Sequence, residues 1–479
     1  MKDGDFTPVY DNSGKMTGRR VVSHYGNEYI IGKKLGAGGV AKVFHAQKVG
    51  DRREYVFKEY VPKPETRMIH ATIKKNLIAL IQHPLLDTSG NKLPHVVSPL
   101  DIIVLKSGGF GYIMEKVDTS SYKSVEKILN HHDFYPDAKI LCKFCKSFAE
   151  FFKTIHLKGW CYKDINEGNI YINPDNGDFW VIDNDNISVA KNKSILGTAG
   201  YMAPEVYITE KPDTYSDYFS IATFFFRLFV GSYPMDGPAT EQYMVQNDLS
   251  VDGAAPVIYG SNALFAFHPT DKRNAVYTAT SNKNYQIQTR KWNALPVQIK
   301  KCMIQTFVTA LPFNKCQQRT SDYQWIQCFE DLEKNHLVQC KKCKKYNFDN
   351  RKTCYCCGKD LPKAPPPPPP PKYEVVFEYL RIVAGKQERG QLAFDLDEKV
   401  PGKRLHPDFS SAPILYAHYR EKAKMYTIHN LGPFTWELAR AGKTAKQPAG
   451  SEVQINSGLV IKVDKTKCLL KVLGIREKK

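Results

Sequence analysis

The spacing of hydrophobic residues predicts a strand-rich region followed by a helix-rich region. Residues 29–35 alternate between apolar and polar side chains, and residues 55–58 and 110–117 read as two more strands. Residues 137–157 instead place apolar side chains at helical spacing, which predicts an amphipathic helix. Its apolar face consists of Ile140, Leu141, Phe144, Phe148, Phe151, Phe152 and Ile155. A second such helix is expected over residues 65–82, so this part of the chain predicts an α+β fold.

A different pattern begins at the proline run of residues 365–371. These seven consecutive prolines favour a stiff polyproline II spacer of about 20 Å, at roughly 3.1 Å per residue, within a linker over residues 363–372. Residues 373–476 then contain short alternating segments separated by turn residues, which predicts a small β-sandwich. At the other end, residues 1–28 are polar, and we expect them to form a loose extension.

Composition narrows the class of protein. A chain of 479 residues suggests about three domains, and 42% hydrophobic residues are enough for at least one sizeable core. The net charge of +19 favours acidic partners, but a solvated basic surface explains it better than nucleic-acid binding. The polar start leads into no apolar run, so we read the twelve cysteines as reduced thiols of a cytoplasmic protein. The longest apolar run, residues 221–230, contains Arg227 and is too short to cross a membrane.

Three polar side chains have the spacing that a phosphoryl-transfer site needs. Asp164 is followed five residues later by Asn169, and Asp183 follows a strand that comes after the turn-forming residues 173–177. Phosphoryl transfer needs one carboxylate to orient a hydroxyl and accept its proton. It also needs an amide and a second carboxylate to hold the metal ion on the nucleotide. The alternative is that two polar turns simply flank a buried strand.

The next stretch of sequence decides between these interpretations. Residues 197–205 read G-T-A-G-Y-M-A-P-E, and Asp217 begins a hydrophobic helix. With these motifs the chain resembles the protein kinase superfamily. The resemblance implies a two-lobed kinase fold over residues 29–336, with an N-lobe at 29–114 and a C-lobe at 118–336. It also implies ATP and Mg²⁺ (or Mn²⁺) as cofactors, with Asp164 and Lys58 as catalytic residues and Asn169 and Asp183 as magnesium ligands.

The resemblance further implies an ATP-binding site. Its candidate residues are Gly36, Gly38, Val43, Lys58, Met114, Glu115 and Val117. The two glycines would let the backbone approach the phosphates, the first valine would pack on the adenine, and the lysine would contact the phosphates. The last three would form the hinge between the lobes, with Met114 as gatekeeper and the backbone of Glu115 and Val117 hydrogen-bonding the edge of the adenine. From the residues alone, a glycine-rich turn and an ordinary core strand remain the alternatives.

The chain departs from the kinase pattern at several positions. Residues 73–77 contain no acid to pair with Lys58, so that ion pair is either missing or supplied by another group. Asn166 stands where Ser/Thr kinases commonly have a lysine, and Asn184 stands where the phenylalanine of D-F-G packs. Lys163 keeps a positive charge that could hold a phosphorylated activation loop. These departures concern regulation more than chemistry.

Other positions match the kinase pattern. Thr198 matches the residue that hydrogen-bonds the catalytic aspartate in Ser/Thr kinases, which favours serine and threonine substrates. Glu205 needs a buried cationic partner, and Arg319 matches the arginine that pairs with it. Ser194 is either an autophosphorylation site or an exposed serine without a role. Residues 240–300 are longer than expected between kinase helices and read as an insertion.

Two C-x-x-C pairs follow the predicted kinase domain and predict a zinc ribbon over residues 337–362. The four ligands would be Cys340, Cys343, Cys354 and Cys357. Their spacing is typical of tetrahedral zinc, and so short a segment cannot build a core unaided. Cys142 and Cys145 form another such pair inside the amphipathic helix, where we read them as buried structural thiols.

The C-terminal β domain also carries a resemblance. Arg404, His418 and residues 430–432 loosely resemble a forkhead-associated domain, which reads phosphothreonine. A plain β-sandwich that docks partners has equal weight. The order of kinase, zinc ribbon, spacer and β domain resembles bacterial kinases associated with tellurite-resistance and von Willebrand A-type proteins. That resemblance implies a cognate phosphatase and a von Willebrand A-type protein as partners.

The sequence therefore predicts a Ser/Thr protein kinase that transfers the γ-phosphate of ATP to protein hydroxyls, including its own. A nucleotide-binding pseudokinase scaffold is the alternative, favoured by the missing acid and by Asn166. It is opposed by the four retained groups, Lys58, Asp164, Asn169 and Asp183. A kinase of small molecules is a third reading, and residues 197–205 oppose it because they resemble a platform for peptide substrates.

Overall fold

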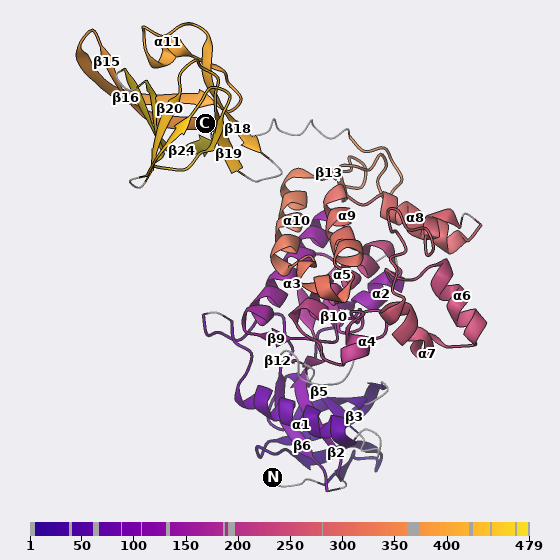
Figure 1. The fold of residues 1–479 in the computed structure, drawn as a ribbon. Helices are drawn as coiled ribbons and strands as arrows, with labels where there is room; N and C mark the ends of the chain where they lie inside the picture. Colours follow the sequence, from indigo (N-terminus) through magenta and orange to yellow (C-terminus); the bar gives the residue numbers. More distant parts are fainter. Residues whose placement is uncertain are drawn as a thin grey trace. The chain divides into compact units, whose positions relative to one another are not determined.

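The chain forms two compact units, residues 1–365 and residues 366–479 (Figure 1). The computed structural model describes residues 5–37, 41–60, 67–87, 89–106, 108–130, 135–184, 187–189, 197–279, 281–362, 373–420, 425–440, 443–464 and 467–477. Three features named above lie outside these described residues: Gly38, Ser194 and the proline run.

A seven-stranded antiparallel sheet forms the small lobe of the first unit. Its strand order is β1-β2-β3-β4-β5-β7-β6. The strands are β1 (Thr7–Tyr10), β2 (Met16–Val22), β3 (Glu28–Ala37), β4 (Ala41–Lys48), β5 (Glu54–Tyr60), β6 (Pro99–Val104) and β7 (Phe110–Glu115). Helix α1 (Arg67–Gln82) buries Ile73 and Leu77 in the hydrophobic cluster that includes Tyr112 of β7. The helix predicted over residues 65–82 therefore covers this sheet.

The prediction of a loose extension over residues 1–28 is wrong for the described part of that segment. Strands β1 and β2 form a hairpin, and β2 pairs antiparallel with β3. Val21 is 2% exposed, and the Arg19 guanidinium lies 4.1 Å from the centroid of the Phe6 ring. The pattern hides this hairpin because an edge ribbon buries few apolar side chains, so most of its residues are polar.

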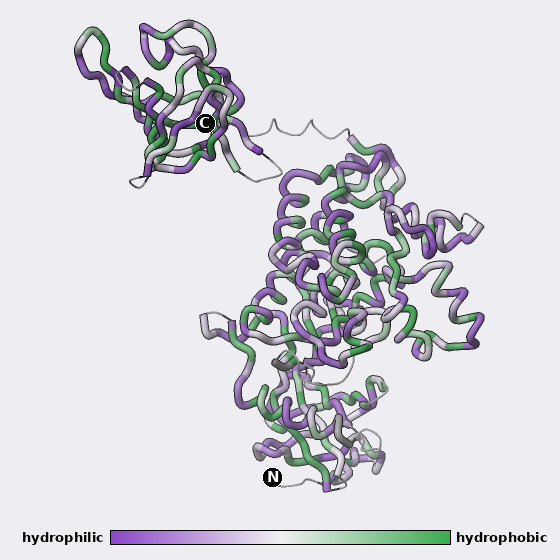
Figure 2. The backbone as a smooth tube through the Cα atoms, in the orientation of Figure 1, coloured by the Kyte–Doolittle hydropathy of each residue, from purple (hydrophilic) through white to green (hydrophobic). Residues whose placement is uncertain are grey.

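The large lobe is helical and is built around α5 (Thr214–Val230), most of whose residues are buried. Figure 2 shows that the helices of this lobe alternate between hydrophilic and hydrophobic positions. The other helices are α2 (Val125–Asn130), α3 (Ala138–Leu157), α4 (Val206–Thr209), α6 (Pro238–Asn247), α7 (Val251–Ala255), α8 (Lys283–Asn293), α9 (Val297–Ile304) and α10 (Asp322–Asn335). Shorter turns are the π-helical η4 (Pro256–Ser261) and η6 (Gln305–Thr309) and the 3₁₀-helical η5 (Val276–Thr278) and η7 (Phe313–Gln318). The short strands are β8 (Lys123–Ser124), β9 (Trp160–Cys161), β10 (Ile170–Ile172), β11 (Phe179–Val181) and β12 (Ser188–Val189).

Helix α3 forms where the hydrophobic periodicity predicts it. The Asp137 carboxylate caps its N-terminus by accepting hydrogen bonds from the backbone of Lys139 and Ile140. Cys142 and Cys145 are fully buried on this helix, and burial raises the pKa of both thiols. The two cysteines are therefore packed core residues, as predicted.

The segment read as an insertion, residues 240–300, is an integral part of the large lobe. Its Phe265 and Trp292 belong to the main hydrophobic core, with ring centroids 5.5 Å apart. The buried Asn274 amide donates to the backbone carbonyls of Met235 and Leu264 at 2.8 and 2.7 Å. The bond to Met235 ties the segment to the loop between α5 and α6.

Residues 337–362, here called the four-cysteine module, pack against the large lobe. Strand β13 (Leu337–Gln339) pairs with β14 (Tyr346–Phe348). Phe348 belongs to the core cluster of the large lobe. The backbone N–H of Tyr346 donates to Oδ2 of Asp137 at 3.1 Å, while Oδ1 of the same carboxylate caps α3. One side chain therefore joins the module to the start of α3.

The second unit is β-rich, as predicted. It contains a six-stranded sheet, β16-β15-β24-β23-β20-β21, and a four-stranded sheet, β17-β18-β19-β22. Phe377, Leu415 and Ile461, from both sheets, are fully buried in one shared core. The elements are β15 (Tyr373–Val383), β16 (Lys386–Asp395), β17 (Val400–Pro401), α11 (Gly402–Leu405), β18 (Pro413–Arg420), β19 (Met425–Asn430), β20 (Trp436–Arg440), β21 (Lys443–Gln447), β22 (Glu452–Gln454), β23 (Val460–Asp464) and β24 (Cys468–Glu477).

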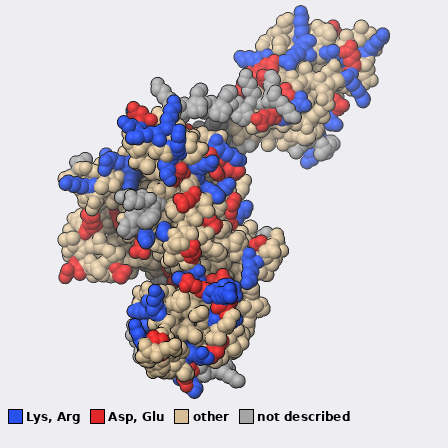
Figure 3. Space-filling view, turned by 180° about the vertical axis from the view of Figure 1, so that it is seen from behind, with Lys and Arg blue, Asp and Glu red and all other residues tan. Residues whose placement is uncertain are grey.

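Two further properties concern the surface of the chain. Among the described residues, no helix combines the length and the hydropathy needed to cross a membrane. On the face that Figure 3 shows, Lys and Arg are interspersed with Asp and Glu instead of gathering into one patch.

Candidate active site

A buried carboxylate fixes the backbone just before Asp164. Asp217 of α5 accepts hydrogen bonds from the backbone N–H groups of Tyr162 and Lys163, at 2.7 and 3.1 Å. Lys163 has a φ of +74°, a strained conformation for a residue with a side chain. The paired acceptor oxygens of Asp217 offset that strain, so this side chain anchors the loop that carries Asp164.

The anchor extends through a buried histidine on α3. Nε2 of His156 lies 3.1 Å from Asp217, and Nδ1 lies 2.7 Å from Asp322 of α10. Burial alone would lower the pKa of His156, but the charges and hydrogen bonds of Asp322 and Asp217 outweigh it and raise the pKa to about 9. A charged imidazole thus joins α3, α5 and α10 behind the loop.

The charge on His156 predicts a loss of stability at alkaline pH. Because its pKa rises from 6.5 to about 9 on folding, the protonated ring stabilises the fold fully below pH 6.5. This contribution, of order 3 kcal/mol, is lost as pH rises through about 9. We expect His156→Gln to lower the urea midpoint at pH 7 and to flatten its dependence between pH 7 and 10. The exposed His83→Gln is the control, and a wild-type midpoint that stays constant over this pH range would contradict the assignment.

The Asp164 carboxylate is hydrogen-bonded at both of its oxygens. Thr198 donates to Oδ1 through its hydroxyl at 2.8 Å and its backbone N–H at 2.9 Å. The Asn166 amide also donates to Oδ1, at 3.1 Å, and the Asn169 amide donates to Oδ2 at 3.1 Å. Asn166 further donates to the Thr198 hydroxyl at 3.0 Å. The Asp164 carboxylate is therefore held by hydrogen bonds from its own loop, residues 164–169, and from the segment that starts at residue 197.

A hairpin brings Asn169 and Asp183 together. Strands β10 and β11 pair antiparallel, and the carbonyl of Asn169 accepts a hydrogen bond from the N–H of Ile182 at 2.9 Å. Asn169 precedes β10 and Asp183 follows β11, so both lie at the same end of this ladder. The turn between the strands is the one predicted from residues 173–177, where Gly177 has a φ of +77°.

Lys58 reaches this cluster from the small lobe. Its Nζ lies 2.9 Å from Oδ1 of Asp183, and the lysine is 7% exposed. A buried ammonium needs an opposite charge, and here Asp183 provides one. The sequence of α1 contains no acid that could pair with Lys58. Asp183 of the large lobe supplies the carboxylate of this ion pair instead.

The other candidate nucleotide-site residues lie on the strands around Lys58. Val43 of β4 is the cross-strand partner of Lys58, and Gly36 of β3 pairs with Val43. Met114, 6% exposed, belongs to a hydrophobic cluster against which Val43 and Val117 pack. Glu115 instead points outward and pairs with Arg53 at 2.9 Å. The structure thus brings Val43, Met114 and Val117 together beside the lysine.

Glu205 and Arg319 meet as the sequence predicts. Their two hydrogen bonds, Nη1 to Oε1 at 2.6 Å and Nη2 to Oε2 at 2.8 Å, form a bidentate pair. Glu205 is 6% exposed and Arg319 is 2% exposed. Arg319 also donates to the carbonyl of Tyr215, which connects the pair to α5.

A further ion pair near the site, between Arg227 and Glu167, is not among the sequence predictions. Nη2 of Arg227 lies 2.5 Å from Oε1 of Glu167, and the hydroxyl of Tyr201 hydrogen-bonds the other oxygen of Glu167. Arg227 is the single charged residue within the apolar run 221–230. That isolated charge is the signal that could have found the pair, because a charge on a buried helix needs a partner.

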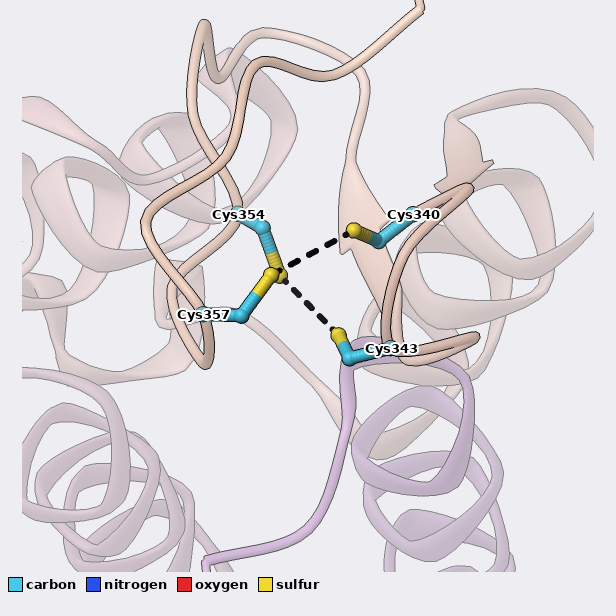
Figure 4. A group of neighbouring side chains, drawn as sticks. All are labelled: Cys340, Cys343, Cys354 and Cys357. Atoms are coloured by element: carbon cyan, nitrogen blue, oxygen red, sulfur yellow. Dashed lines mark hydrogen bonds between the residues drawn. The ribbon is translucent and has the colours of Figure 1, made fainter.

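Four thiols of the four-cysteine module converge from its two turns (Figure 4). The ligand atoms of Cys340, Cys343, Cys354 and Cys357 all lie within 4.8 Å of one another. The sulfurs of Cys343 and Cys354 are 3.5 Å apart, and those of Cys340 and Cys357 are 3.6 Å apart. Sulfurs bound to one tetrahedral zinc at about 2.3 Å would be roughly 3.8 Å apart, so the cluster fits such an ion. Cys356 is exposed and lies outside this group.

Comparison with known proteins assigns the family. Residues 29–279 match the family model described as "Protein kinase domain". The chain belongs to the protein kinase family. It is 30% identical over 125 residues to "Serine/threonine-protein kinase pkn2" of Myxococcus xanthus, which covers 23% of this chain and 15% of that protein. It is 23% identical over 241 residues to "Serine/threonine-protein kinase PknB" of Mycobacterium leprae, covering 46% of this chain and 35% of that one.

This kinase spans well under half the length of those two curated relatives. Among solved structures, it is similar to the autoinhibited serine kinase domain of the giant muscle protein titin. That similarity has a TM-score of 0.44 and 15% identity, over 62% of this chain and 78% of that one.

Proposed function

We propose that this kinase is an ATP-dependent serine/threonine protein kinase. The observation that carries the proposal is the set of donors on Asp164, from Asn169, Asn166 and Thr198, beside the Lys58–Asp183 pair. Asp164 orients the substrate hydroxyl and accepts its proton, and Lys58 anchors the ATP phosphates. The chain covers only 15% and 35% of those two relatives. The proposed activity is therefore argued from the residues of this chain and not from the activity of the relatives.

A divalent metal fits the donors present. Asp183 offers carboxylate oxygens, and Asn169 offers its amide oxygen because its amide nitrogen is directed at Asp164. Oxygen ligands of these two types suit Mg²⁺ or Mn²⁺. When bound, the ion would neutralise negative charge on the phosphates of ATP.

Substrate class is inferred from the segment that meets Asp164. The Thr198 hydroxyl contacts the catalytic carboxylate at 2.8 Å, which supports serine and threonine over tyrosine in the kinase resemblance. Asn166 cannot supply the positive charge of the usual lysine, but its amide holds both Asp164 and Thr198. Lys163 remains the candidate partner of a phosphorylated loop, although burial lowers the pKa of its ammonium.

The test of this function is label transfer from γ-labelled ATP. We expect the wild-type chain to label itself and a generic protein substrate on serine and threonine, and Asp164→Ala to transfer no label while still binding nucleotide. Phosphoamino acid analysis identifies the acceptor. Nucleotide binding without transfer by the wild-type chain would favour the pseudokinase scaffold instead.

We also propose that the four-cysteine module binds structural zinc. The thiols must be reduced to bind it, which fits a cytoplasmic protein. We expect about one zinc ion per purified chain by mass spectrometry, and Cys354→Ser to lose it and to expose the module to trypsin. Cys356→Ser is the matched control, because this neighbour is exposed and outside the cluster. Zinc retained by Cys354→Ser would refute the ligand assignment.

The C-terminal unit is proposed as the partner-docking module. Within it, Arg404 donates to the backbone carbonyl of Ala393 at 2.8 Å and pairs with Glu398, so a phosphate would have to compete with that carboxylate. A phosphothreonine reader therefore has support from the resemblance only, and a plain docking sandwich stays the alternative. A cognate phosphatase and a von Willebrand A-type protein are the proposed partners.

A further inference from the structure

A pocket of about 600 Å³ lies between the four-cysteine module and the large lobe, and none of the candidate active-site residues lines it. Its walls come from residues 135–141 at the start of α3, from the ends of α5 and α8, and from residues 345–356 of the module. No part of the proposed phosphoryl transfer or zinc binding explains a space of this size.

The walls of the pocket are held in place by contacts around it. The hydroxyl of Tyr355 donates to the carbonyl of Pro136 at 3.4 Å, and the amide of Asn350 donates to the carbonyl of Ala294 at 3.1 Å. The backbone of Tyr346 is bonded to Asp137 at 3.1 Å. These bonds join the module to α3 and to the end of α8, so the pocket exists before any ligand binds, which lowers the cost of binding.

The floor of the pocket is apolar and its side is aromatic. Leu141, Phe229, Leu295 and Phe348 line it, and the Tyr135 and Tyr355 rings meet edge to face with centroids 6.4 Å apart. The amide of Asn347 is already hydrogen-bonded within the module. Its oxygen accepts from the Tyr355 backbone N–H at 2.9 Å, and its nitrogen donates to the Lys345 carbonyl at 3.1 Å. These walls suit a flat apolar body.

All the charged side chains that line the pocket are cations. They are Lys291, Lys345 and Arg351, and no Asp or Glu lines it. Within the described part of the chain, none of the three has a carboxylate at ion-pair distance, although many other surface cations do. Three cations line this apolar space and no acid does, so an anionic group inside it would meet positive side chains within contact distance.

We propose that this pocket binds a small anion with a flat apolar body and a single carboxylate or phosphate group. The body lies on the apolar floor beside Tyr355, and the anionic group contacts Lys345 and Arg351. A volume of about 600 Å³ falls in the range of pockets for small organic ligands, and a few charged groups at the edge of an apolar cavity give orientation. The proposal does not depend on kinase activity.

The test uses three probes that share one ring system: 1-naphthyl phosphate, 1-naphthoate and the uncharged 1-naphthol. Binding is measured by calorimetry on the full chain with a saturating non-hydrolysable ATP analogue, so that the nucleotide site is occupied. We expect at least one of the two anions to bind about tenfold or more tightly than 1-naphthol. The comparison of the two anions identifies the head group.

Two variants locate the site. The double substitution Lys345→Ala and Arg351→Ala should weaken anion binding about tenfold, and Ala294→Trp should abolish it by filling the space. The control is Lys341→Ala with Lys342→Ala, which removes two exposed lysines of the same module that do not line the pocket. Equal binding of 1-naphthol and the anions, no saturable binding, or equal affinity in the pocket and control variants would each overturn the proposal.

Discussion

Replacing Asp183 with asparagine is expected to weaken binding of Mg²⁺-ATP and to slow phosphoryl transfer, whereas Asp164→Asn is expected to slow transfer alone. Asp183 pairs with Lys58 at 2.9 Å and is proposed to hold the metal ion. Its loss removes both a metal ligand and the charge beside a buried lysine. Asp164 instead has its oxygens directed at Thr198 and Asn169. Asp164 is proposed to orient the reacting hydroxyl, so we expect its replacement to leave ATP binding unchanged.

The expected losses in turnover are large for both variants. A general base contributes about 10²–10⁴ in rate, and one preorganised electrostatic group contributes about 10²–10³. Turnover is measured by label transfer to protein, and nucleotide affinity by calorimetry. Asp175→Asn, an exposed position in the turn of the same hairpin, is the control and should resemble wild type. Wild-type turnover in Asp164→Asn, or an equal loss of nucleotide affinity in both variants, would contradict these roles.

Local spacing predicts the parts of the site that are near in sequence. Asp164, Asn169 and Asp183 lie within twenty residues, and one turn with the pairing of β10 and β11 brings them together. Such an arrangement follows from strand and turn signals alone. The Glu205–Arg319 pair lies far apart in sequence, and only the kinase resemblance could join it.

The features that sequence reasoning missed depend on tertiary contacts. The hairpin of β1 and β2 is recognisable only once β3 offers an edge to pair with, since its own residues are mostly polar. The partner of Lys58 could not be chosen from the sequence, because the kinase resemblance places the acid on α1, whereas the carboxylate comes from the other lobe. His156 gives no signal either, since a lone histidine on an amphipathic helix does not reveal two buried carboxylates.

Breaking the Glu205–Arg319 pair is the second large effect that we expect. Glu205→Ala leaves the guanidinium of Arg319, which is 2% exposed, without its carboxylate inside the large lobe. Removing one member of a buried ion pair costs about 3–5 kcal/mol, because the remaining charge has lost its water and its partner. The loss is measured by urea unfolding, with hydrogen exchange of the α5 and α10 amides to assign it to this lobe. Glu330, whose side chain is 44% exposed and pairs with Lys334, provides the control variant Glu330→Ala, expected to change little.

The double variant Glu205→Leu with Arg319→Met separates the cost of an unpaired charge from the worth of the pair. Arg319 packs its guanidinium 5.2 Å from the centroid of the Phe219 ring, so an apolar side chain of similar length has a surface to lie on. If most of the loss in Glu205→Ala comes from the unpaired guanidinium, the double variant recovers most of the stability. It would still lack the bond from Arg319 to the Tyr215 carbonyl, which positions the start of α5. A double variant as unstable as Glu205→Ala would instead show that the bidentate geometry itself supports the lobe.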